Sequence, residues 1–300
     1  FKVDKFLFFM ASPPKASELI LNPDGSVYHL ALKAEQVAPT VILVGDPGRV
    51  PVISGFFDAI EHRVTKREFN THTGRLGKHR LTVLSTGIGT DNIDIAVTEL
   101  DALFNVDPET RQPRDTFTRL DFIRIGTSGC LQPDIPVGSL LASAYGLGLD
   151  GLLHFYRYEE SQPIRRLTAD FQSFLDRSGL DLPIPPYFGR ADAELLAKYG
   201  SGLHQGITVS CPGFYGPQGR HLRLQPWRTD LLDQLAAYQY GAHRITNIEM
   251  ETAAIYAMAE SLGHRALSLN ALIANRASGT FSEDPRGVIV ALTRHFLSCL

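Results

Sequence analysis

The stretch Val41-Ile42-Leu43-Val44-Gly45-Asp46-Pro47-Gly48-Arg49 contains the pattern that decides the fold. Four consecutive apolar residues that end at a glycine are typical of a short strand buried on both faces. Asp46 is a good helix N-cap and Pro47 suits the first helical position, so we expect a helix to begin here. A strand, a glycine turn and a helix in this order are the start of a βαβ unit.

The same order recurs along the chain. Expected strands cover residues 41–44, 81–84, 122–125, 206–210 and 266–274, and expected helices cover 91–104, 251–262 and 287–297. This alternation predicts an α/β fold, a single domain with a central, mostly buried β-sheet flanked by α-helices. Ligands of such folds bind at the carboxyl ends of the strands.

Two stretches lack this pattern. Residues 11–26 are rich in Pro, Ser and Asn, which predicts an extended N-terminal arm over 1–27 in front of a domain over 28–300. Residues 157–190 contain four prolines and are expected to be an irregular surface excursion. The apolar run Phe6 to Phe9 is too short to span a bilayer.

Composition excludes several classes of protein. Apolar residues make up 44% of the chain, and the net charge of -3 gives no basic face for nucleic acid. Three widely spaced cysteines with no CxxC pair argue against a disulfide framework and a zinc site, and favour a reducing, cytoplasmic location. No apolar run approaches the roughly 20 residues that a membrane helix needs.

Three glycine-containing segments could bind an anion. In the first, Gly45 to Arg49, a helix N-terminus and a guanidinium suit phosphate, although a plain strand-to-helix turn is the alternative. The second, Arg124-Ile125-Gly126-Thr127-Ser128-Gly129, is expected as a loop. Its buried Arg124 needs an anion or a structural carboxylate partner. The third is Thr86-Gly87-Ile88-Gly89-Thr90.

Other phosphate and hydrolase motifs are incomplete or absent. The third segment begins like GxGxxG, but Asn92 replaces the last glycine, so dinucleotide binding is not supported. GxSxG fails around Ser128 because Cys130 replaces the second glycine. The chain contains neither GxxxxGK[ST] nor HExxH, which excludes a P-loop and a zinc hydrolase of that type.

Two further segments suit a base and a sugar. The loop Phe214-Tyr215-Gly216-Pro217-Gln218-Gly219-Arg220 can stack on a planar ring and hydrogen-bond the edge of a base such as uracil. Glu249 and Glu251 flank Met250 at an expected strand-to-helix junction, where one carboxylate can accept from ribose hydroxyls. The alternatives are an ordinary surface turn and an acidic helix start.

Taken together, these segments resemble the hexameric-type nucleoside phosphorylases, and most of all the uridine phosphorylases. The matching motifs, in chain order, are Tyr28-His29-Leu30, Gly45-Asp46-Pro47-x-Arg49, Arg67-Glu68-Phe69, Ser85-Thr86-Gly87-Ile88-Gly89, Arg124 to Gly129, Phe214 to Arg220, Asn247-x-Glu249-Met250-Glu251 and Ile273-Ala274-Asn275-Arg276. The resemblance covers roughly residues 28 to 298 and implies a mixed sheet distorted toward a barrel. The base loop departs from the family in reading Gly-Pro-Gln for Pro-Gly-Gln.

The resemblance also implies residue roles. Phosphate would be bound by Gly45, Arg49, Arg67, Arg124 and Thr127, ribose by His29, Met250 and Glu251, and the base by Phe214, Gln218, Arg220, Gly129 and Ile273, with Ser128 and Glu249 supporting. Arg220 and Gln218 are the expected catalytic residues, because they would stabilise charge on the leaving base. Arg67 and His29 would reach into the site of a neighbouring subunit. That implies a homo-oligomer with shared sites, a dimer or a trimer of dimers.

The implied reaction is the reversible phosphorolysis of a pyrimidine nucleoside, uridine foremost, with inorganic phosphate as co-substrate and no required cofactor. In some relatives a potassium ion lies between subunits, at positions that match Glu68 and Ile88. Asn92 stands here where a further serine ligand is expected. Purine-specific members carry an Asp at the position of Asn275, so its absence disfavours purines. A purine phosphorylase, a nucleoside hydrolase and a non-catalytic nucleoside-binding protein are the alternatives.

Overall fold

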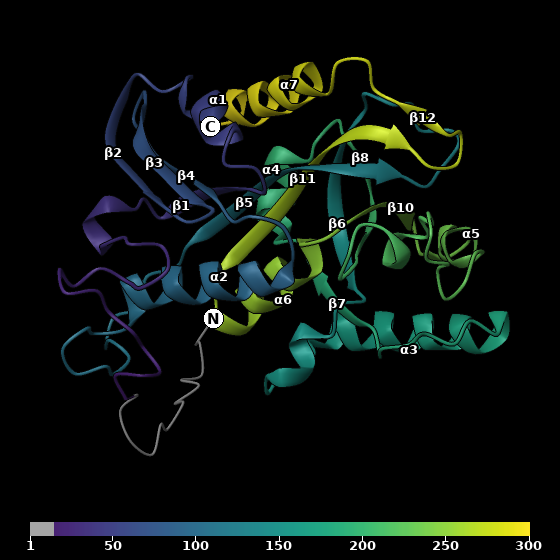
Figure 1. Ribbon diagram of the computed structural model, residues 1–300, viewed down its shortest axis with the longest axis horizontal. Helices are drawn as coiled ribbons and strands as arrows, with labels where there is room; N and C mark the ends of the chain where they lie inside the picture. Colours follow the sequence, from purple (N-terminus) through teal and green to yellow (C-terminus); the bar gives the residue numbers. More distant parts are fainter. Residues whose placement is uncertain (1–14) are drawn as a thin grey trace.

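The computed structural model describes residues 15–300, and Figure 1 shows their arrangement. Residues 1–14, with the apolar run Phe6 to Phe9 and half of the expected arm, lie outside the described part. In residues 15–27 an antiparallel bridge joins Leu21 to Val27. Val27 is buried in the main hydrophobic core. The last residue of the expected arm therefore already belongs to the body of the protein.

Within residues 15–300, the strands form one mixed sheet, and α-helices and short 3-10 helices connect them. The strands are β1 Thr40–Val44, β2 Ala59–Lys66, β3 Phe69–Leu76, β4 His79–Ser85, β5 Asp121–Cys130, β6 Leu140–Gly148, β7 Tyr187–Arg190, β8 His204–Ser210, β9 Gln239–Tyr240, β10 His243–Glu249, β11 Arg265–Asn275 and β12 Thr280–Phe281. The α-helices are α1 Arg49–Ser54, α2 Thr90–Asn105, α3 Gln162–Ser178, α4 Ala193–Tyr199, α5 Leu231–Ala236, α6 Thr252–Leu262 and α7 Pro285–Ser298. The 3-10 helices are η1 Ala34–Gln36, η2 Leu152–Phe155 and η3 Gly216–Gln218.

Five of these strands close on themselves. The sheet runs β12-β11-β6-β8-β10-β5-β1-β4-β3-β2, and an additional pairing of β11 with β5 joins its two parts into a ring. The closed ring is β5-β11-β6-β8-β10. β5 pairs parallel with β11 but antiparallel with β10. The expected α/β fold with a mixed, barrel-like sheet is confirmed.

Irregular registers mark three of the ring strands. The register shifts between Ile245 and Asn247 in β10, between Ser143 and Tyr145 in β6, and between Leu272 and Ala274 in β11. A β-bulge bends its strand and increases its twist, and both are needed when a sheet closes. The bulge in β11 falls at Ile273, a predicted wall of the base site.

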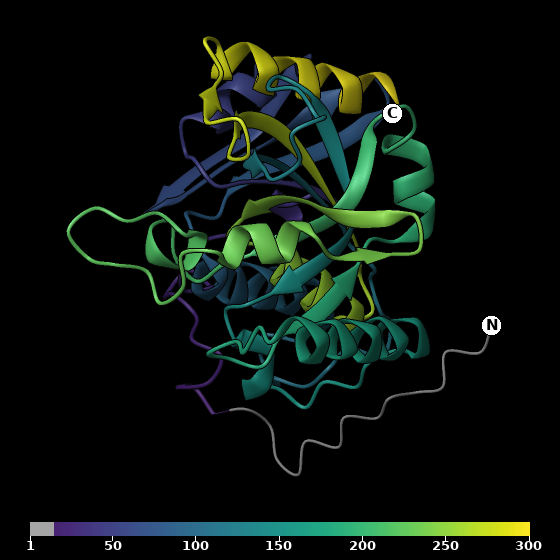
Figure 2. The ribbon, with the colours of Figure 1, turned by 90° about the vertical axis from the view of Figure 1, so that its right-hand side faces the viewer.

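Helices cover both sides of the sheet, as Figures 1 and 2 show. α7 packs on β11 and β5 and touches α1, while α6 packs on the barrel strands and on α2. α6 is buried from Thr252 to Ala259, on all its faces. A helix that is apolar all round needs a layer on each side. α2 and the barrel supply these two layers.

Two local expectations about the anion segments were wrong. α1 begins at Arg49 with Gly48 as its N-cap, because the Asp46 carboxylate accepts from the N–H of Gly48 at 2.8 Å and closes a turn before the helix. Beyond the expected strand 122–125, the segment Gly126 to Gly129 is not a loop, since β5 continues through it to Cys130. Gly126 therefore lies inside a strand, where a missing side chain leaves room for a neighbour.

The expected irregular excursion over 157–190 was also wrong in its middle. α3 fills Gln162–Ser178, with Pro163 in its first turn, where the absent N–H costs nothing. Ile164, Leu167, Phe171 and Leu175 are its buried residues. Their spacing places them on one face of a helix, and that signal was present in the sequence.

Candidate active site

Adjacent strand ends bring most of the predicted phosphate and ribose residues together. β1 pairs with β5 so that Leu43 lies opposite Arg124, and with β4 so that Val44 lies opposite Ser85. The turns after β1 and β4 therefore open beside the middle of β5. β10 ends at Glu249, from which the chain turns into α6. These strand ends thus bring together two arginines and two glutamates, Arg49, Arg124, Glu249 and Glu251.

Arg124 is the centre of this cluster. The residue is only 6% exposed, and its Nη2 lies 2.9 Å from Glu249 Oε2 and 2.6 Å from Glu251 Oε2. Its Nη1 donates to Asn270 Oδ1 at 3.1 Å. A Cβ on Gly126 would lie 1.8 Å from Nη1, so only glycine lets the guanidinium fold back along β5. The sequence left open whether a carboxylate pairs with Arg124, and in the structure Glu249 and Glu251 both do.

Arg49 provides a second positive charge next to Arg124. Its Nη2 donates to Thr127 Oγ1 at 3.2 Å, which ties the turn after β1 to β5. Burial, followed by the positive charge of Arg124, lowers the pKa of Arg49. Arg124 is paired with two carboxylates, whereas Arg49 makes no ion pair within residues 15–300, so the charge of Arg49 is the one left for an anion. Gly45 directly follows β1, and a Cβ at this position would lie 3.4 Å from the Gly87 carbonyl oxygen.

The two glutamates have different surroundings. Glu249 accepts from Ser210 Oγ at 2.6 Å and from the N–H groups of Glu251 and Thr252, so it caps the start of α6. Glu251 accepts from the N–H of Gly89 at 2.8 Å and from Arg124. Burial raises the pKa of Glu251, and Arg124 opposes that shift. Glu249 therefore caps the helix, as expected for an acidic helix start. Glu251 is held where the start of α6, the start of α2 and β5 meet.

The base loop is organised around Arg220. Its Nη1 donates to Gln218 Oε1 at 2.6 Å and to the Phe214 carbonyl at 2.7 Å, and its guanidinium lies 3.7 Å from the centre of the Phe214 ring. Gln218 is buried, and its amide oxygen is used by Arg220, so its NH₂ is the group left for a ligand. Burial and the charge of Arg276 lower the pKa of Arg220 to about 10, so the side chain stays charged at neutral pH.

Arg276 also contacts the base loop, although its motif gave no role for it. Its Nη1 donates to the Gln218 carbonyl at 3.1 Å, and its backbone N–H donates to Cys130 at the end of β5. A Cβ on Gly129 would lie 3.4 Å from Arg276 Cγ. Arg276 thus joins the base loop to Gly129, two residues from Thr127. The predicted phosphate cluster and the predicted base loop are therefore neighbours in the structure.

The family model of the phosphorylase superfamily matches residues 39–289. The chain belongs to the phosphorylase superfamily. It is 33% identical to a uridine phosphorylase of Thermococcus kodakarensis over 94% of this chain and 86% of that protein, and 31% identical to the uridine phosphorylase of Escherichia coli K12 over 83% and 86%. A solved structure of a Trypanosoma brucei nucleoside phosphorylase that shows uridine phosphorylase activity matches with a TM-score of 0.79 and 26% identity, over 93% of this chain and 99% of the other.

Two predicted residues of this phosphorylase superfamily member lie away from the cluster of their own chain. His29 Nδ1 lies 2.6 Å from Glu99 Oε1 on α2. Arg67 is exposed in the turn between β2 and β3, with a positive φ of 55°. Neither contacts Arg49 or Arg124 within residues 15–300. Their assignment to a neighbouring subunit's site stays a prediction.

The potassium site expected through Glu68 and Ile88 has an unfavourable neighbour. Asn92 Nδ2 lies 3.4 Å from the Ile88 carbonyl, which places an N–H donor at an oxygen that would have to bind the cation. Within residues 15–300, no group of three or more His, Cys, Asp or Glu side chains could hold a metal ion. The potassium ion stays a prediction, and no step below uses it.

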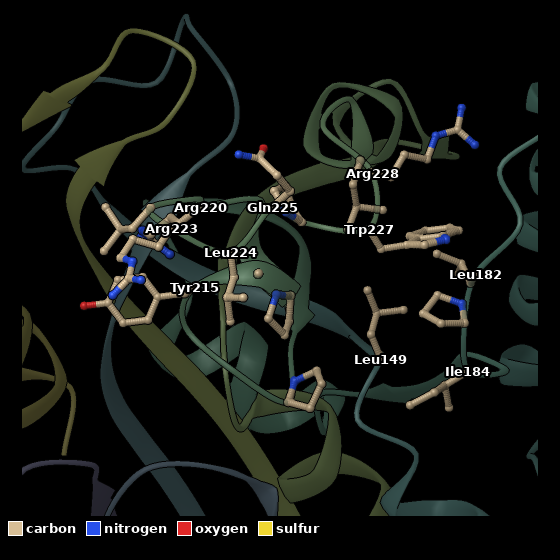
Figure 3. A pocket seen from close by; sticks show the side chains of 17 residues that line it. Leu149, Leu182, Ile184, Tyr215, Arg220, Arg223, Leu224, Gln225, Trp227 and Arg228 are labelled. Atoms are coloured by element: carbon tan, nitrogen blue, oxygen red, sulfur yellow. The ribbon is translucent and has the colours of Figure 1, made fainter.

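A cavity of about 730 Å³ borders the base loop, and Figure 3 shows its lining. Tyr215 and Arg220 form one end, and Trp227, Leu182 and Ile184 form the apolar walls. The lining includes none of the phosphate or ribose residues. The cavity is therefore distinct from the phosphate and ribose cluster, but it meets the base loop at Tyr215 and Arg220.

Proposed function

We propose that this chain catalyses the reversible phosphorolysis of a pyrimidine nucleoside, uridine foremost, to the free base and ribose 1-phosphate. The observation that carries the proposal is the convergence of Arg49, Arg124 and Thr127 beside Glu251, with the Gln218–Arg220 pair joined to them through Arg276. The uridine phosphorylases among its relatives support the same substrate class.

In the proposed reaction the bond between the base and C1′ breaks, and a bond from a phosphate oxygen to C1′ forms. Arg49 and Arg124 orient the phosphate, and Glu251 accepts from ribose hydroxyls. The sugar becomes cation-like, while the leaving uracil gains negative charge. Arg220 and Gln218 donate to that charge and stabilise it more in the transition state than in the ground state, by about 2.7–4 kcal/mol for one such donor. No side chain has to act as a nucleophile.

The environment of Asn275 supports a pyrimidine over a purine. Its Nδ2 donates to the carbonyls of Gln132 and Ile135, both at 2.9 Å. Its Oδ1 accepts from the N–H groups of Ala277 and Ser278. Every hydrogen-bonding group of this buried amide is thus used within the protein, and no N–H is left to donate to N7 of a purine.

We infer further that the protein is a homo-oligomer with shared active sites. The positions of His29 and Arg67 away from their own cluster support this arrangement. Ile88 and Phe155 are 68% and 89% exposed, which is unusual for such side chains and typical of surfaces that a partner covers.

The proposed location is the cytoplasm. Cys130, Cys211 and Cys299 are all free, as expected in a reducing compartment. None of the helices in the described part of the chain is long and apolar enough to cross a membrane.

A panel of nucleosides tests the proposal. Uridine, deoxyuridine, thymidine, inosine and adenosine are each incubated with the protein, with and without inorganic phosphate, and release of the free base is followed by liquid chromatography. We expect release from uridine only when phosphate is present, together with formation of ribose 1-phosphate. Release without phosphate would instead indicate a hydrolase. Uridine binding without any release would indicate a binding protein.

A further inference from the structure

The interior of the closed barrel contains a ring of polar side chains. Each of its five strands contributes to it, and its members are Arg124 and Ser128 from β5, Asn270 from β11, Ser143 from β6, Thr208 from β8 and Asn247 from β10. We call these six residues the barrel ring. Barrels of this size are usually filled by apolar side chains. The four members outside β5 are all 0% exposed.

Hydrogen bonds join the members in order around the barrel. Arg124 Nη1 lies 3.1 Å from Asn270 Oδ1, and Asn270 Nδ2 lies 3.0 Å from Ser143 Oγ. From there, 2.5 Å separates Ser143 Oγ from Thr208 Oγ1, and Thr208 donates to Asn247 Oδ1 at 2.8 Å. Asn247 Nδ2 then donates to Ser128 Oγ at 2.8 Å. The chain of bonds thus leaves β5 at Arg124 and returns to it at Ser128.

The direction of these bonds is determined by Arg124. A guanidinium can only donate, so the Asn270 oxygen must face it and the Asn270 NH₂ must face Ser143. The Ser143 hydroxyl accepts from Asn270 and donates to the Thr208 hydroxyl. The Thr208 hydroxyl in turn donates to Asn247 Oδ1. Ser128 consequently accepts from Asn247. Among the residues that the structure describes, the Ser128 hydroxyl has no acceptor for its own proton. Its neighbours in β5 are Thr127, which Arg49 contacts, and Gly129, which lies next to Arg276.

We propose that the barrel ring is a positioning device that holds Arg124 at one end and orients the hydroxyl proton of Ser128 into the pocket at the other. Ser143, Thr208, Asn247 and Asn270 are then positioning residues that act on substrates through Arg124 and Ser128. The proposal rests on the proposed function, because it needs phosphate and nucleoside to bind beside β5.

Because the barrel ring is buried, it can hold Arg124 and Ser128 in fixed orientations. A buried donor or acceptor that loses its partner carries a large desolvation penalty, so each member restricts the next to one orientation. A ring that merely satisfied the core would not need to begin and end on residues of the pocket. The pair Thr73 and Thr82 is an example of such a core contact. Its hydroxyl oxygens lie 2.7 Å apart in β3 and β4, fully buried, with no link to a pocket residue.

The variant Thr208→Val breaks the ring at its midpoint. Valine has nearly the same shape, and along the ring two members separate Thr208 from Arg124 and one separates it from Ser128. Thr208→Ser keeps the hydroxyl and should restore the ring. Thr73→Val is the matched control, since it removes one equally buried hydroxyl from a strand of the same sheet but leaves the ring intact.

Two readouts are measured for each variant. The first is the rise in Tm that inorganic phosphate produces, which requires no catalysis. The second is the set of KM for phosphate, KM for uridine and kcat. For Thr208→Val we expect a clearly smaller phosphate-induced rise in Tm and at least about a threefold higher KM for phosphate, because valine makes neither of the two ring hydrogen bonds of Thr208. Thr208→Ser and Thr73→Val should match the wild type in both readouts.

The outcomes separate the two proposals. A wild-type protein whose Tm does not respond to phosphate would overturn the proposed phosphate site and the ring with it. If the Tm of the wild type rises with phosphate but Thr208→Val behaves like the wild type in both readouts, the ring alone would be overturned. The same holds if Thr73→Val is impaired to the same extent as Thr208→Val. If Thr208→Val does not fold, Ser143→Ala removes the neighbouring hydroxyl with a smaller change in shape, and the same comparison applies.

Discussion

Arg220 shows how one side chain serves two purposes in this site. Its guanidinium stacks on Phe214 and donates to the Gln218 amide oxygen, so the loop is ordered by the same group that we propose binds the base. The aromatic and polar composition of the loop indicated a base site. Sequence could not show that Gln218 would present only its NH₂, because that depends on which donor lies next to its oxygen.

Replacing Arg220 should affect catalysis more than stability. We expect Arg220→Ala to lower turnover on uridine at least about tenfold, because the leaving base loses a charged donor. Steady-state kinetics with saturating phosphate measure this. Arg223→Ala is the control, since this exposed neighbour in the same segment makes no ion pair within residues 15–300, and it should keep wild-type turnover. Wild-type turnover in Arg220→Ala would refute the base-site assignment.

At the scale of single elements, β5 and α3 were interpreted incorrectly from sequence. Glycines usually end strands, so the Gly126-Thr127-Ser128-Gly129 segment was expected to be a loop. β11 pairs with β5 along its whole length, and this long-range pairing keeps the segment extended. Four prolines hid the amphipathic pattern of α3, although the only one inside it, Pro163, stands at a position where helices accept proline.

α3 should stabilise the fold without shaping the site. Phe171 is fully buried, with its ring centre 5.4 Å from that of Phe188 on β7 and 4.8 Å from that of Tyr238. We expect Phe171→Ala to lower the free energy of unfolding by about 3–5 kcal/mol, as for other buried phenylalanines, with KM for uridine little changed. Urea denaturation measures the first quantity.

The exposed face of the same helix provides the control for this prediction. Arg166 is exposed and makes no ion pair in the part of the chain that the structure describes. Arg166→Ala should therefore stay within about 0.5 kcal/mol of the wild type. If Phe171→Ala were no less stable than Arg166→Ala, the packing of α3 on β7 would be disproved.

At the scale of the whole molecule, the closed barrel and the expected oligomer together define the site. Closure brings β5, β10 and β11 side by side, so that Arg124, Glu249 and Glu251 meet although they are far apart in sequence. His29 and Arg67 are directed elsewhere, and the proposed partner subunit would receive them. Under this proposal a complete site requires two copies of the chain.

Mixing two inactive variants tests this sharing. Arg67→Ala and Arg124→Ala should each lose most activity. After subunit exchange the mixture should regain about a quarter of wild-type activity, because half of the dimers are mixed and each mixed dimer has one intact site. Mixing Arg49→Ala with Arg124→Ala is the control and should regain nothing, since both residues belong to one chain's cluster. Equal recovery in both mixtures, or none in either, would contradict sharing through Arg67.

The sequence by itself determined the features that depend on neighbouring residues. The apolar run before Gly45, the glycine stop of α6 at Gly263 and the spacing of the motifs were sufficient for the fold class and the family. These signals are readable because local backbone preferences and side-chain periodicity act over a few residues.

Only the tertiary structure decided which polar groups meet. The pairing of Arg124 with both glutamates, the role of Glu249 as a cap and the barrel ring all join residues from different strands. Isolated polar residues in apolar strands, such as Asn270 and Asn247, were the only trace of the ring in the sequence. Their partners became defined when the barrel closed, because buried polar groups must find hydrogen bonds among whatever side chains the closed sheet places beside them.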